Sequence, residues 1–213
     1  MNFKIISYYC DIDDSKYYER SYDRLKIKLD EYDYDYDLVK LESLGSYKEN
    51  CRRKPKFILD KLREHNMDVM WLDIDTILRN RMTDAENLPD DIDIVFASSN
   101  KDIGGCKASP IIIKNNYKGK RFLEQWCNNI DSSREMNYEC FDHEVLFHAI
   151  QTAANYSTIA FLNETYCTWP GQENDNTVIL MGLSDNESKK ESLKKMGICD
   201  KLIEHQSIGF YEE

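Results

Sequence analysis

The chain has few of the residues that interrupt a fold or cross-link it. Only 4 prolines and 8 glycines occur in 213 residues, and no linker rich in Pro, Gly or Ser divides them. We therefore expect a single domain over residues 1–213. The 7 cysteines are an odd number at irregular spacing, without a Cys-x-x-Cys pair. This pattern disfavours a zinc knuckle or a thioredoxin-type motif and indicates free thiols in a reducing, cytoplasmic location.

Basic charge and long apolar runs are also scarce. The chain has 28 Lys and Arg against 39 Asp and Glu, a net charge of −11. A protein that binds duplex nucleic acid or an anionic membrane surface needs a basic face, so this balance argues against both partners. No apolar run approaches the length of a membrane span, and we expect none. The acidity does not exclude a small anionic ligand, because a bound metal ion can invert the local charge.

Short apolar runs alternate with helical patterns along the first half of the chain. Strands are predicted at 3–8, 38–41, 69–72, 92–97, 111–113, 157–162 and 178–181. Helices are predicted up to residue 31 behind a cap at 13–15, from residue 54, and over 122–130, 141–154 and 188–196. The Tyr- and Asp-rich stretch 32–37 is expected to form a solvated loop. The alternation predicts an α/β fold with three α/β/α layers and a mostly parallel central sheet.

The strongest chemical signal is the sequence Trp-Leu-Asp-Ile-Asp-Thr at residues 71–76. Its two carboxylates follow a hydrophobic strand, and in α/β sheets ligands bind beyond the carboxyl ends of the strands. Side chains at i and i+2 of an extended segment point the same way, so Asp73 and Asp75 are expected to face one hard cation. Oxygen ligands favour Mg²⁺ or Mn²⁺, which in turn bind phosphate oxygens. The alternative is a surface turn with incidental acids.

Two enzyme classes place Asp-x-Asp after a buried strand. In aspartyl phosphatases the first Asp attacks phosphorus, the second is a general acid, and a Thr follows four residues after the first. That position is Ile77 here, and Asp73 follows two apparent strand–helix units instead of opening the fold. This class therefore fits less well. A metal-dependent phosphatase or nucleotide-sugar phosphohydrolase that uses the same carboxylates stays an alternative.

The second class fits the order of motifs along the chain. Residues 69–78 resemble the Asp-x-Asp element of nucleotide-sugar glycosyltransferases of GT-A fold, and residues 54–58 resemble the helix opening before it. Residues 106–113, 122–126 and 142–146 resemble the donor-sugar segment, the next helix and the Asp-Gln-Asp segment of retaining members. The chain as a whole resembles the N-terminal glycosyltransferase domain of a protein from a chlorovirus, a large algal virus. The resemblance implies a GT-A-like fold and, for a viral protein, a location in the host cytoplasm.

The resemblance also implies a set of ligands. Asp73, Asp75 and His205 would hold Mn²⁺ or Mg²⁺ on the diphosphate of a UDP-sugar donor, and an imidazole beside two carboxylates favours Mn²⁺. A surface histidine is the alternative for His205. The residues implied to contact the donor are Tyr8, Tyr9, Asp73, Lys107, Ala108 and Ser109. One of the two tyrosines is expected to pack in the core instead.

A dense basic run at residues 52–56 lies at a predicted helix N-terminus, where backbone N–H groups favour anions. Arg53 and Lys54 are the expected phosphate or sugar contacts, and a solvated face is the alternative. Asp142 and His143 open another predicted helix and are the expected catalytic residues. Asp142 would bind sugar hydroxyls, steady an oxocarbenium-like centre or, in an inverting enzyme, act as general base. A helix N-cap is its structural alternative.

These observations predict a metal-dependent glycosyltransferase. It would move a hexose or deoxyhexose from a UDP-sugar to a glycan or glycoprotein acceptor, with retention at the anomeric carbon. The segment Trp169-Pro170-Gly171 is a surface candidate for the acceptor side. A non-catalytic carbohydrate-binding module is the alternative from a different class.

Overall fold

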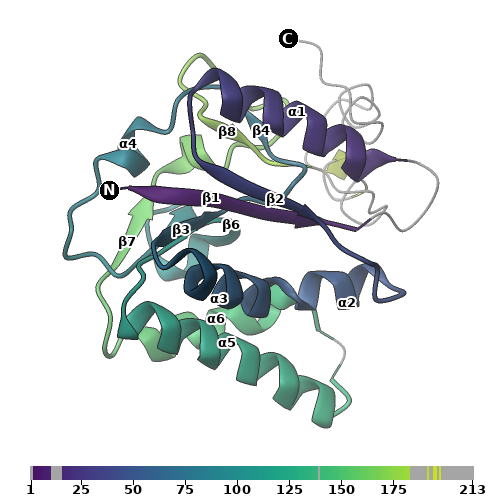
Figure 1. The fold of residues 1–213 in the computed structure, drawn as a ribbon, viewed down its shortest axis with the longest axis vertical. Coiled ribbons are helices and arrows are strands. Elements are labelled where there is room, and N and C mark those ends of the chain that lie inside the picture. The colour runs from purple at the N-terminus through teal and green to yellow at the C-terminus, as the bar shows by residue number, and fades with distance from the viewer. Residues whose placement is uncertain are drawn as a thin grey trace.

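The computed structural model describes residues 2–10, 16–138 and 140–182, together with 191, 194, 195 and 197. A central six-stranded sheet lies between two layers of other elements (Figure 1). Its strands, in spatial order, are β2 (Tyr36–Lys40), β1 (Phe3–Tyr9), β3 (Asp68–Trp71), β6 (Cys106–Ile113), β5 (Ile94–Ser98) and β7 (Ile159–Leu162). Neighbouring strands are parallel except at β6, which runs antiparallel to both β3 and β5. The expected α/β fold with a mostly parallel sheet is confirmed.

Helices cover both faces of this sheet. One face carries α3 (Lys54–His65), α5 (Tyr117–Glu135) and α6 (Asp142–Ala153), and the other carries α1 (Tyr17–Glu31) (Figure 1). A small antiparallel sheet of β4 (Ile77–Leu78) and β8 (Ile179–Leu180) packs on the α1 side. The remaining described elements are α2 (Tyr47–Arg52), α4 (Thr83–Glu86) and the 3₁₀ turns Ile103–Gly105 and Glu164–Tyr166.

Alternate residues of the central strands enter two separate cores. In β3, Val69 and Trp71 pack in the core beneath α3, α5 and α6, whereas Met70 packs with Leu25 and Leu29 of α1. Successive strand side chains point to opposite faces, so a sheet covered on both sides needs apolar residues at nearly every position. This explains the unbroken apolar runs that mark these strands in the sequence.

Several element boundaries differ from the prediction, three of them at strands or helices that position the site. β2 begins at Tyr36, inside the stretch predicted as loop, because Tyr36 already pairs with Ile5 of β1. β6 begins at Cys106, earlier than predicted, because it continues its pairing with the end of β5. α5 begins at Tyr117, behind an Asn116 cap. The predicted cap at 13–15 and most of the predicted helix 188–196 lie outside the described residues.

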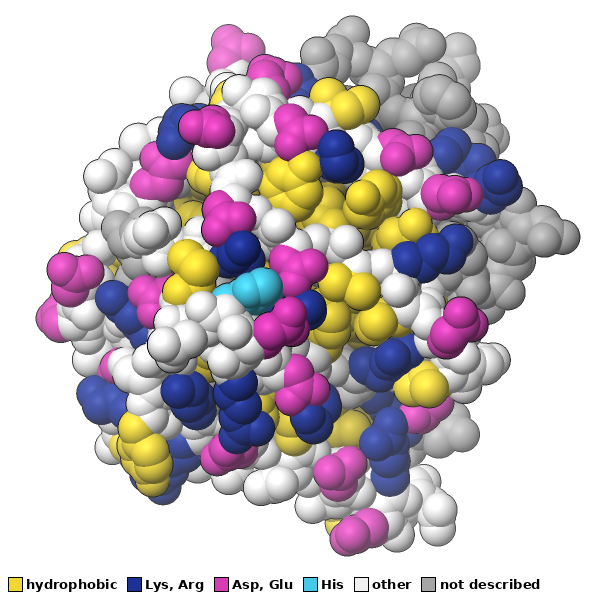
Figure 2. All heavy atoms as spheres, in the orientation of Figure 1, with side chains coloured by type: hydrophobic (Ala, Val, Ile, Leu, Met, Phe, Trp, Pro, Cys, Tyr) yellow, Lys and Arg dark blue, Asp and Glu magenta, His cyan; other side chains and the backbone are white. Residues whose placement is uncertain are grey.

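Two surface features bear on the expected partners. Within the described part of the chain, no helix combines the length and the apolar character needed to cross a membrane. On the face shown in Figure 2, Lys and Arg side chains are interspersed with Asp and Glu. The net charge of −11 is therefore not gathered into one acidic patch on this face.

Candidate active site

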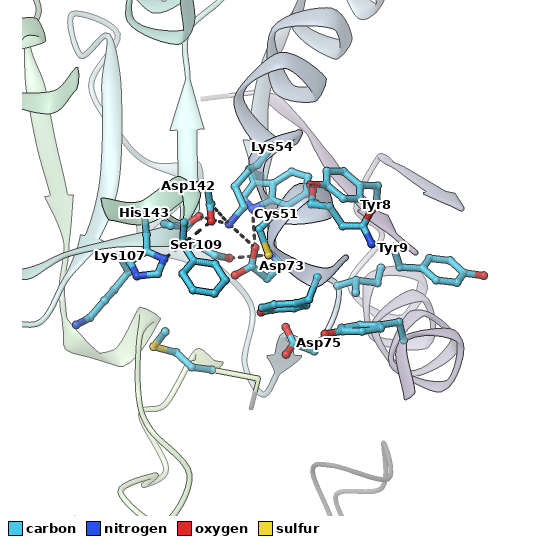
Figure 3. Close-up of a pocket in the computed structure, with 18 of the residues that line it drawn as sticks. Tyr8, Tyr9, Cys51, Lys54, Asp73, Asp75, Lys107, Ser109, Asp142 and His143 are labelled. Atoms are coloured by element: carbon cyan, nitrogen blue, oxygen red, sulfur yellow. Dashed lines mark hydrogen bonds and ion pairs between the residues drawn. The ribbon is translucent and has the colours of Figure 1, made fainter. Parts of the chain in front are cut away.

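A pocket opens at the carboxyl ends of β1 and β3, where both strands pass into loops. Its volume is about 670 Å³, a size typical of small-molecule sites. It brings together ten of the twelve predicted site residues (Figure 3): Tyr8, Tyr9, Lys54, Asp73, Asp75, Lys107, Ala108, Ser109, Asp142 and His143. Of the other two, Arg53 does not line the pocket and His205 lies outside the described residues.

Asp73 is held at its backbone and at one carboxylate oxygen. Its N–H donates to Ser109 Oγ at 2.8 Å, which ties the end of β3 to β6. Its Oδ1 accepts from Trp71 Nε1 at 2.9 Å and lies 2.9 Å from Lys54 Nζ. The side chain is nevertheless 40% exposed, so Asp73 presents carboxylate surface to the pocket.

Asp75 lines the same pocket, but it does not lie on an extended segment with Asp73 as expected. The chain turns directly after Asp73, whose carbonyl accepts from Thr76 N–H at 2.9 Å, so the two carboxylates do not share an extended segment. Asp75 is 6% exposed, and its Oδ2 accepts from the Tyr17 hydroxyl at 3.3 Å. A Cβ on Gly182 would lie 2.1 Å from Asp75 Cγ. The absence of a side chain at Gly182 is therefore what leaves room for Asp75, a contact that the sequence did not reveal.

Lys54 and Asp142 form a buried ion pair at the inner end of the pocket. α3 begins at Lys54 and α6 begins at Asp142, and Lys54 Nζ lies 2.9 Å from Asp142 Oδ2. The same ammonium contacts Asp73 at 2.9 Å, so it bridges two carboxylates. Burial alone would lower the pKa of Lys54, but the Asp142 and Asp73 carboxylates raise it well above its ordinary value. Lys54 is therefore a cation in the pocket, and its contact with a donor phosphate stays a prediction.

Asp142 is the first residue of α6 and not its N-cap. Phe141 holds the N-cap position, and its N–H donates to Glu144 Oε2. The capping alternative for Asp142 is therefore wrong, because its side chain turns to Lys54 instead of back to the helix backbone. Arg52, which sequence reasoning left without a role, fixes the preceding loop by donating from Nε to the carbonyl of Cys140 at 2.8 Å.

Both tyrosines at the end of β1 are buried, not only one. Tyr8 is 8% exposed, and its ring centroid lies 5.2 Å from that of Trp71. Tyr9 is 7% exposed and packs on the opposite face against Tyr22, with centroids 5.5 Å apart. They enter opposite cores because they are neighbours on one strand. Their contact with a nucleotide base stays a prediction.

Arg53 does not line the pocket. Its guanidinium donates to the carbonyl of Glu42 at 2.6 Å. The structure therefore does not place Arg53 with the other predicted donor contacts. The nearby Cys51 does line the pocket, although no motif in the sequence singled it out. Burial, with a smaller effect of Asp142, raises the pKa of the Cys51 thiol to about 12.

The two aspartates have the chemistry of a site for a hard divalent cation. Both line the pocket, and carboxylate oxygens suit Mn²⁺ and Mg²⁺. Among the described residues, no third His, Cys, Asp or Glu completes a tight cluster with them. The expected third ligand, His205, falls outside the described part of the chain.

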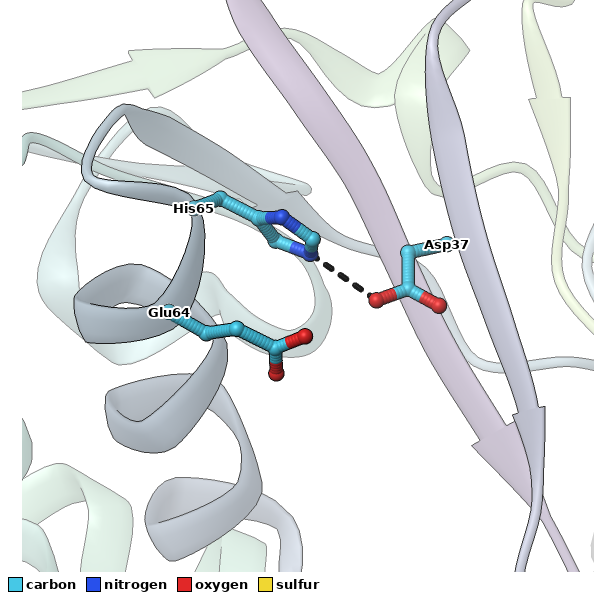
Figure 4. Close-up of side chains that lie close together, drawn as sticks. All are labelled: Asp37, Glu64 and His65. Carbon is cyan, nitrogen blue, oxygen red and sulfur yellow. Dashed lines mark hydrogen bonds and ion pairs between the residues drawn. The ribbon is translucent and has the colours of Figure 1, made fainter.

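One cluster of potential metal ligands lies elsewhere among the described residues. It consists of Asp37, Glu64 and His65 (Figure 4). Lys61 Nζ lies 2.7 Å from Asp37 Oδ2 and 2.9 Å from Glu64 Oε2, and His65 Nε2 lies 2.8 Å from Asp37 Oδ2. The Lys61 ammonium already bridges the two carboxylates of this cluster, so its geometry is explained without a metal ion.

No protein-family model matches the sequence, and no curated protein matches it. Solved structures match in three dimensions. A glycosyltransferase involved in the glycosylation of the major capsid of PBCV-1 gives a TM-score of 0.67 at 9% identity, over 92% of this chain and 99% of that chain. The galactosyltransferase LgtC, solved with donor and acceptor sugar analogues, gives 0.51 at 10% identity, over 84% and 86%. The glycosyltransferase GlyE of Streptococcus pneumoniae TIGR4 gives 0.50 at 15% identity, over 100% of this chain and 66% of that chain.

The first of these matches agrees with the resemblance to a chlorovirus glycosyltransferase domain that the sequence motifs indicated. At identities of 9–15% the likeness concerns the fold. The chain has the α/β fold of the GT-A-type glycosyltransferases.

Proposed function

We propose that this protein is a glycosyltransferase that moves a hexose or deoxyhexose from a UDP-sugar to a glycan or glycoprotein acceptor. The observation that carries the proposal is the position of Asp73 and Asp75 in a pocket at the end of β3, within a fold shared with glycosyltransferases. Ligands of open α/β sheets bind at this edge. A pocket of about 670 Å³ is large enough for a nucleotide sugar.

We further propose that Asp73 and Asp75, with His205 as the third ligand, hold Mn²⁺ or Mg²⁺. The cation would supply positive charge for the diphosphate leaving group. Both carboxylates line the pocket, which leaves its other residues for contacts with the rest of the donor and with the acceptor. Lys107, Ala108 and Ser109 of β6 lie along one side of it, where they would contact the donor sugar.

Asp142 is proposed to act on the transferred sugar. Its carboxylate lies in the pocket with one oxygen paired to Lys54. In the transfer, the acceptor oxygen forms a bond to the anomeric carbon while the bond from that carbon to the diphosphate breaks. UDP leaves with the electron pair, and the acceptor proton passes to the leaving phosphate in a retaining reaction. Asp142 would anchor the sugar hydroxyls and stabilise the oxocarbenium-like centre.

Neither alternative function gains support. The three solved structures compared above are all glycosyltransferases. An aspartyl phosphatase would need a Thr four residues after Asp73, where this chain has Ile77. A binding module without catalysis would not need the buried Lys54–Asp142 pair in its pocket.

A thermal-shift panel of UDP-, GDP- and dTDP-sugars, each with and without Mn²⁺, tests the proposal. A ligand at about 100 times its Kd adds roughly 2.7 kcal/mol to stability. For a domain of this size that is a rise in Tm of roughly 5–10 °C. We expect this rise for a UDP-sugar with Mn²⁺ and little change for the other nucleotides. Equal shifts for all three nucleotides, or none, would contradict the assignment.

A further inference from the structure

Three aromatic rings form one wall of the pocket. We define the aromatic wall as Tyr47 of α2 together with Phe141 and His143 at the start of α6, all of which line the pocket. The rings of Phe141 and His143 are stacked, with centroids 5.6 Å apart and planes 19° apart. The ring of Tyr47 lies 6.0 Å from that of Phe141, centroid to centroid. The donor contacts proposed above use neither Tyr47 nor Phe141.

The aromatic wall lies at the open side of the pocket. The side chain of His143 is 60% exposed, whereas those of its neighbour Asp142 and of Lys54 are 4% and 8% exposed. The ion pair therefore marks the closed end, and the rings mark the mouth. A glycan acceptor continues beyond the sugar that reacts, so it has to enter from the open side.

The chemistry of the wall matches a sugar ring. A pyranose has apolar C–H faces and a polar edge of hydroxyls, and aromatic side chains offer an apolar face with a polar rim. Polar groups surround the rings. Lys48 Nζ lies 5.6 Å from the Phe141 centroid, and the Glu144 carboxylate accepts from the N–H of Phe141. This hydrogen bond holds the backbone of Phe141, and the contacts with His143 and Tyr47 hold its ring before a ligand arrives.

We propose that the aromatic wall stacks against a pyranose ring of the acceptor glycan and so places an acceptor hydroxyl beside Asp142. His143 of the aromatic wall follows Asp142 directly in the chain, and His143 Nδ1 lies 3.9 Å from Asp142 Oδ1. A ring held on Phe141 and His143 therefore lies next to the proposed sugar carboxylate. This assignment rests on the proposed glycosyl transfer, and it adds the acceptor subsite to it.

The experiment measures UDP release from the UDP-sugar selected by the thermal-shift panel, first with water as acceptor and then with a panel of methyl glycosides. The glycosides cover hexoses, deoxyhexoses and pentoses in both anomeric forms. We expect Phe141→Ala to raise the KM for the stimulating glycoside by about five- to tenfold, the effect of losing one aromatic contact. The KM for the donor should change less than twofold. Tyr47→Ala should act in the same direction with a smaller effect.

Two controls keep the result interpretable. Tyr117→Ala removes a ring that is 74% exposed and does not line the pocket, and it should change neither KM. Phe141→Leu keeps an apolar side chain without the flat ring. If Phe141→Ala fails to fold, Phe141→Leu provides the same comparison.

The outcomes separate this proposal from the proposed function. No UDP release from any UDP-sugar would contradict the transferase itself. UDP release with an unchanged glycoside KM in the Phe141 variants would overturn the acceptor subsite alone. Equal increases in both KM values would assign the wall to the donor sugar, and a wild type that no glycoside stimulates would also overturn the proposal.

Discussion

The Asp142 carboxylate and the Lys54 ammonium lie 2.9 Å apart, and their side chains are 4% and 8% exposed. Removing one partner of a buried ion pair leaves an uncompensated charge and costs about 3–5 kcal/mol. Lys54 also contacts Asp73, so its charge stays partly compensated when Asp142 is replaced. One ammonium therefore connects the proposed sugar carboxylate to the proposed metal site. Its raised pKa keeps it charged at neutral pH.

Asp142→Asn should separate catalysis from donor binding. Asn keeps the shape of the side chain but removes its charge, so we expect turnover to fall by roughly 10²-fold or more. Lys54 retains Asp73, so the loss of stability should stay near 1–3 kcal/mol. Titration calorimetry should find the affinity for UDP with Mn²⁺ nearly unchanged. Full activity in this variant would remove Asp142 from the reaction.

The product anomer refines the role of Asp142. If the anomeric configuration is retained, Asp142 is a sugar anchor and the acidic limb of the pH–rate profile survives in Asp142→Asn. If it is inverted, Asp142 is the general base and that limb flattens. NMR of the product gives the configuration. Retention together with a flattened limb would contradict the account of the transfer given above.

Gly182→Ala should displace Asp75, although Gly182 itself does not line the pocket. The added Cβ would lie 2.1 Å from Asp75 Cγ and 2.4 Å from its carbonyl oxygen, so Asp75 has to move. We expect most Mn²⁺-dependent turnover to be lost, with a destabilisation of about 1–3 kcal/mol. Gly104→Ala is the matched control, because its Cβ meets only a carboxylate oxygen of Asp102 at 3.3 Å. Equal activity in the two variants would show that the position of Asp75 is unimportant.

Cys51 should resist alkylation in the folded protein. Burial, followed by the nearby Asp142, raises the pKa of its thiol to about 12, and only the thiolate reacts readily. An ordinary thiol is about half ionised near pH 8.5, so iodoacetamide at about pH 9 should label Cys51 far faster in urea than in the native state. Mass spectrometry of the peptides measures both rates.

The raised pKa of the Cys51 thiol also determines how the stability of the fold depends on pH. The native state holds the Cys51 proton to a higher pH than the unfolded chain does. Its contribution to stability is therefore complete below about pH 8.5 and is lost as the pH rises toward 12. Fast native labelling of Cys51 at about pH 9 would contradict the burial of this thiol.

The sequence predicted those parts of the site that depend on local pattern. The apolar run before Asp73 marks a strand buried on both faces, and ligands bind where such a strand ends. It did not distinguish Arg53 from Lys54, because successive helical residues point about 100° apart and only packing decides which one enters a pocket. Lys54 does so, whereas Arg53 donates to the Glu42 carbonyl.

Other parts depend on contacts between distant segments. Gly182 meets Asp75 only after β8 has paired with β4. Phe141 was predicted only as the first residue of a helix, and its place in the pocket depends on the loop that Arg52 holds at Cys140. No periodicity or spacing records such tertiary contacts. The outline of the site was therefore predictable, while its supports and its aromatic wall were not.

The central claim is tested most directly by UDP release from UDP-sugars with Mn²⁺ and with EDTA, in the wild type and in Asp75→Asn. Asp75 lies in the pocket and is 6% exposed, so Asn should preserve the fold and remove one metal ligand. Asp90→Asn, at a carboxylate 96% exposed, is the control. We predict release that needs Mn²⁺, is normal in Asp90→Asn and is abolished in Asp75→Asn, with an unchanged Tm. Near-normal release by Asp75→Asn, or wild-type release that EDTA does not reduce, would contradict the metal-dependent transferase.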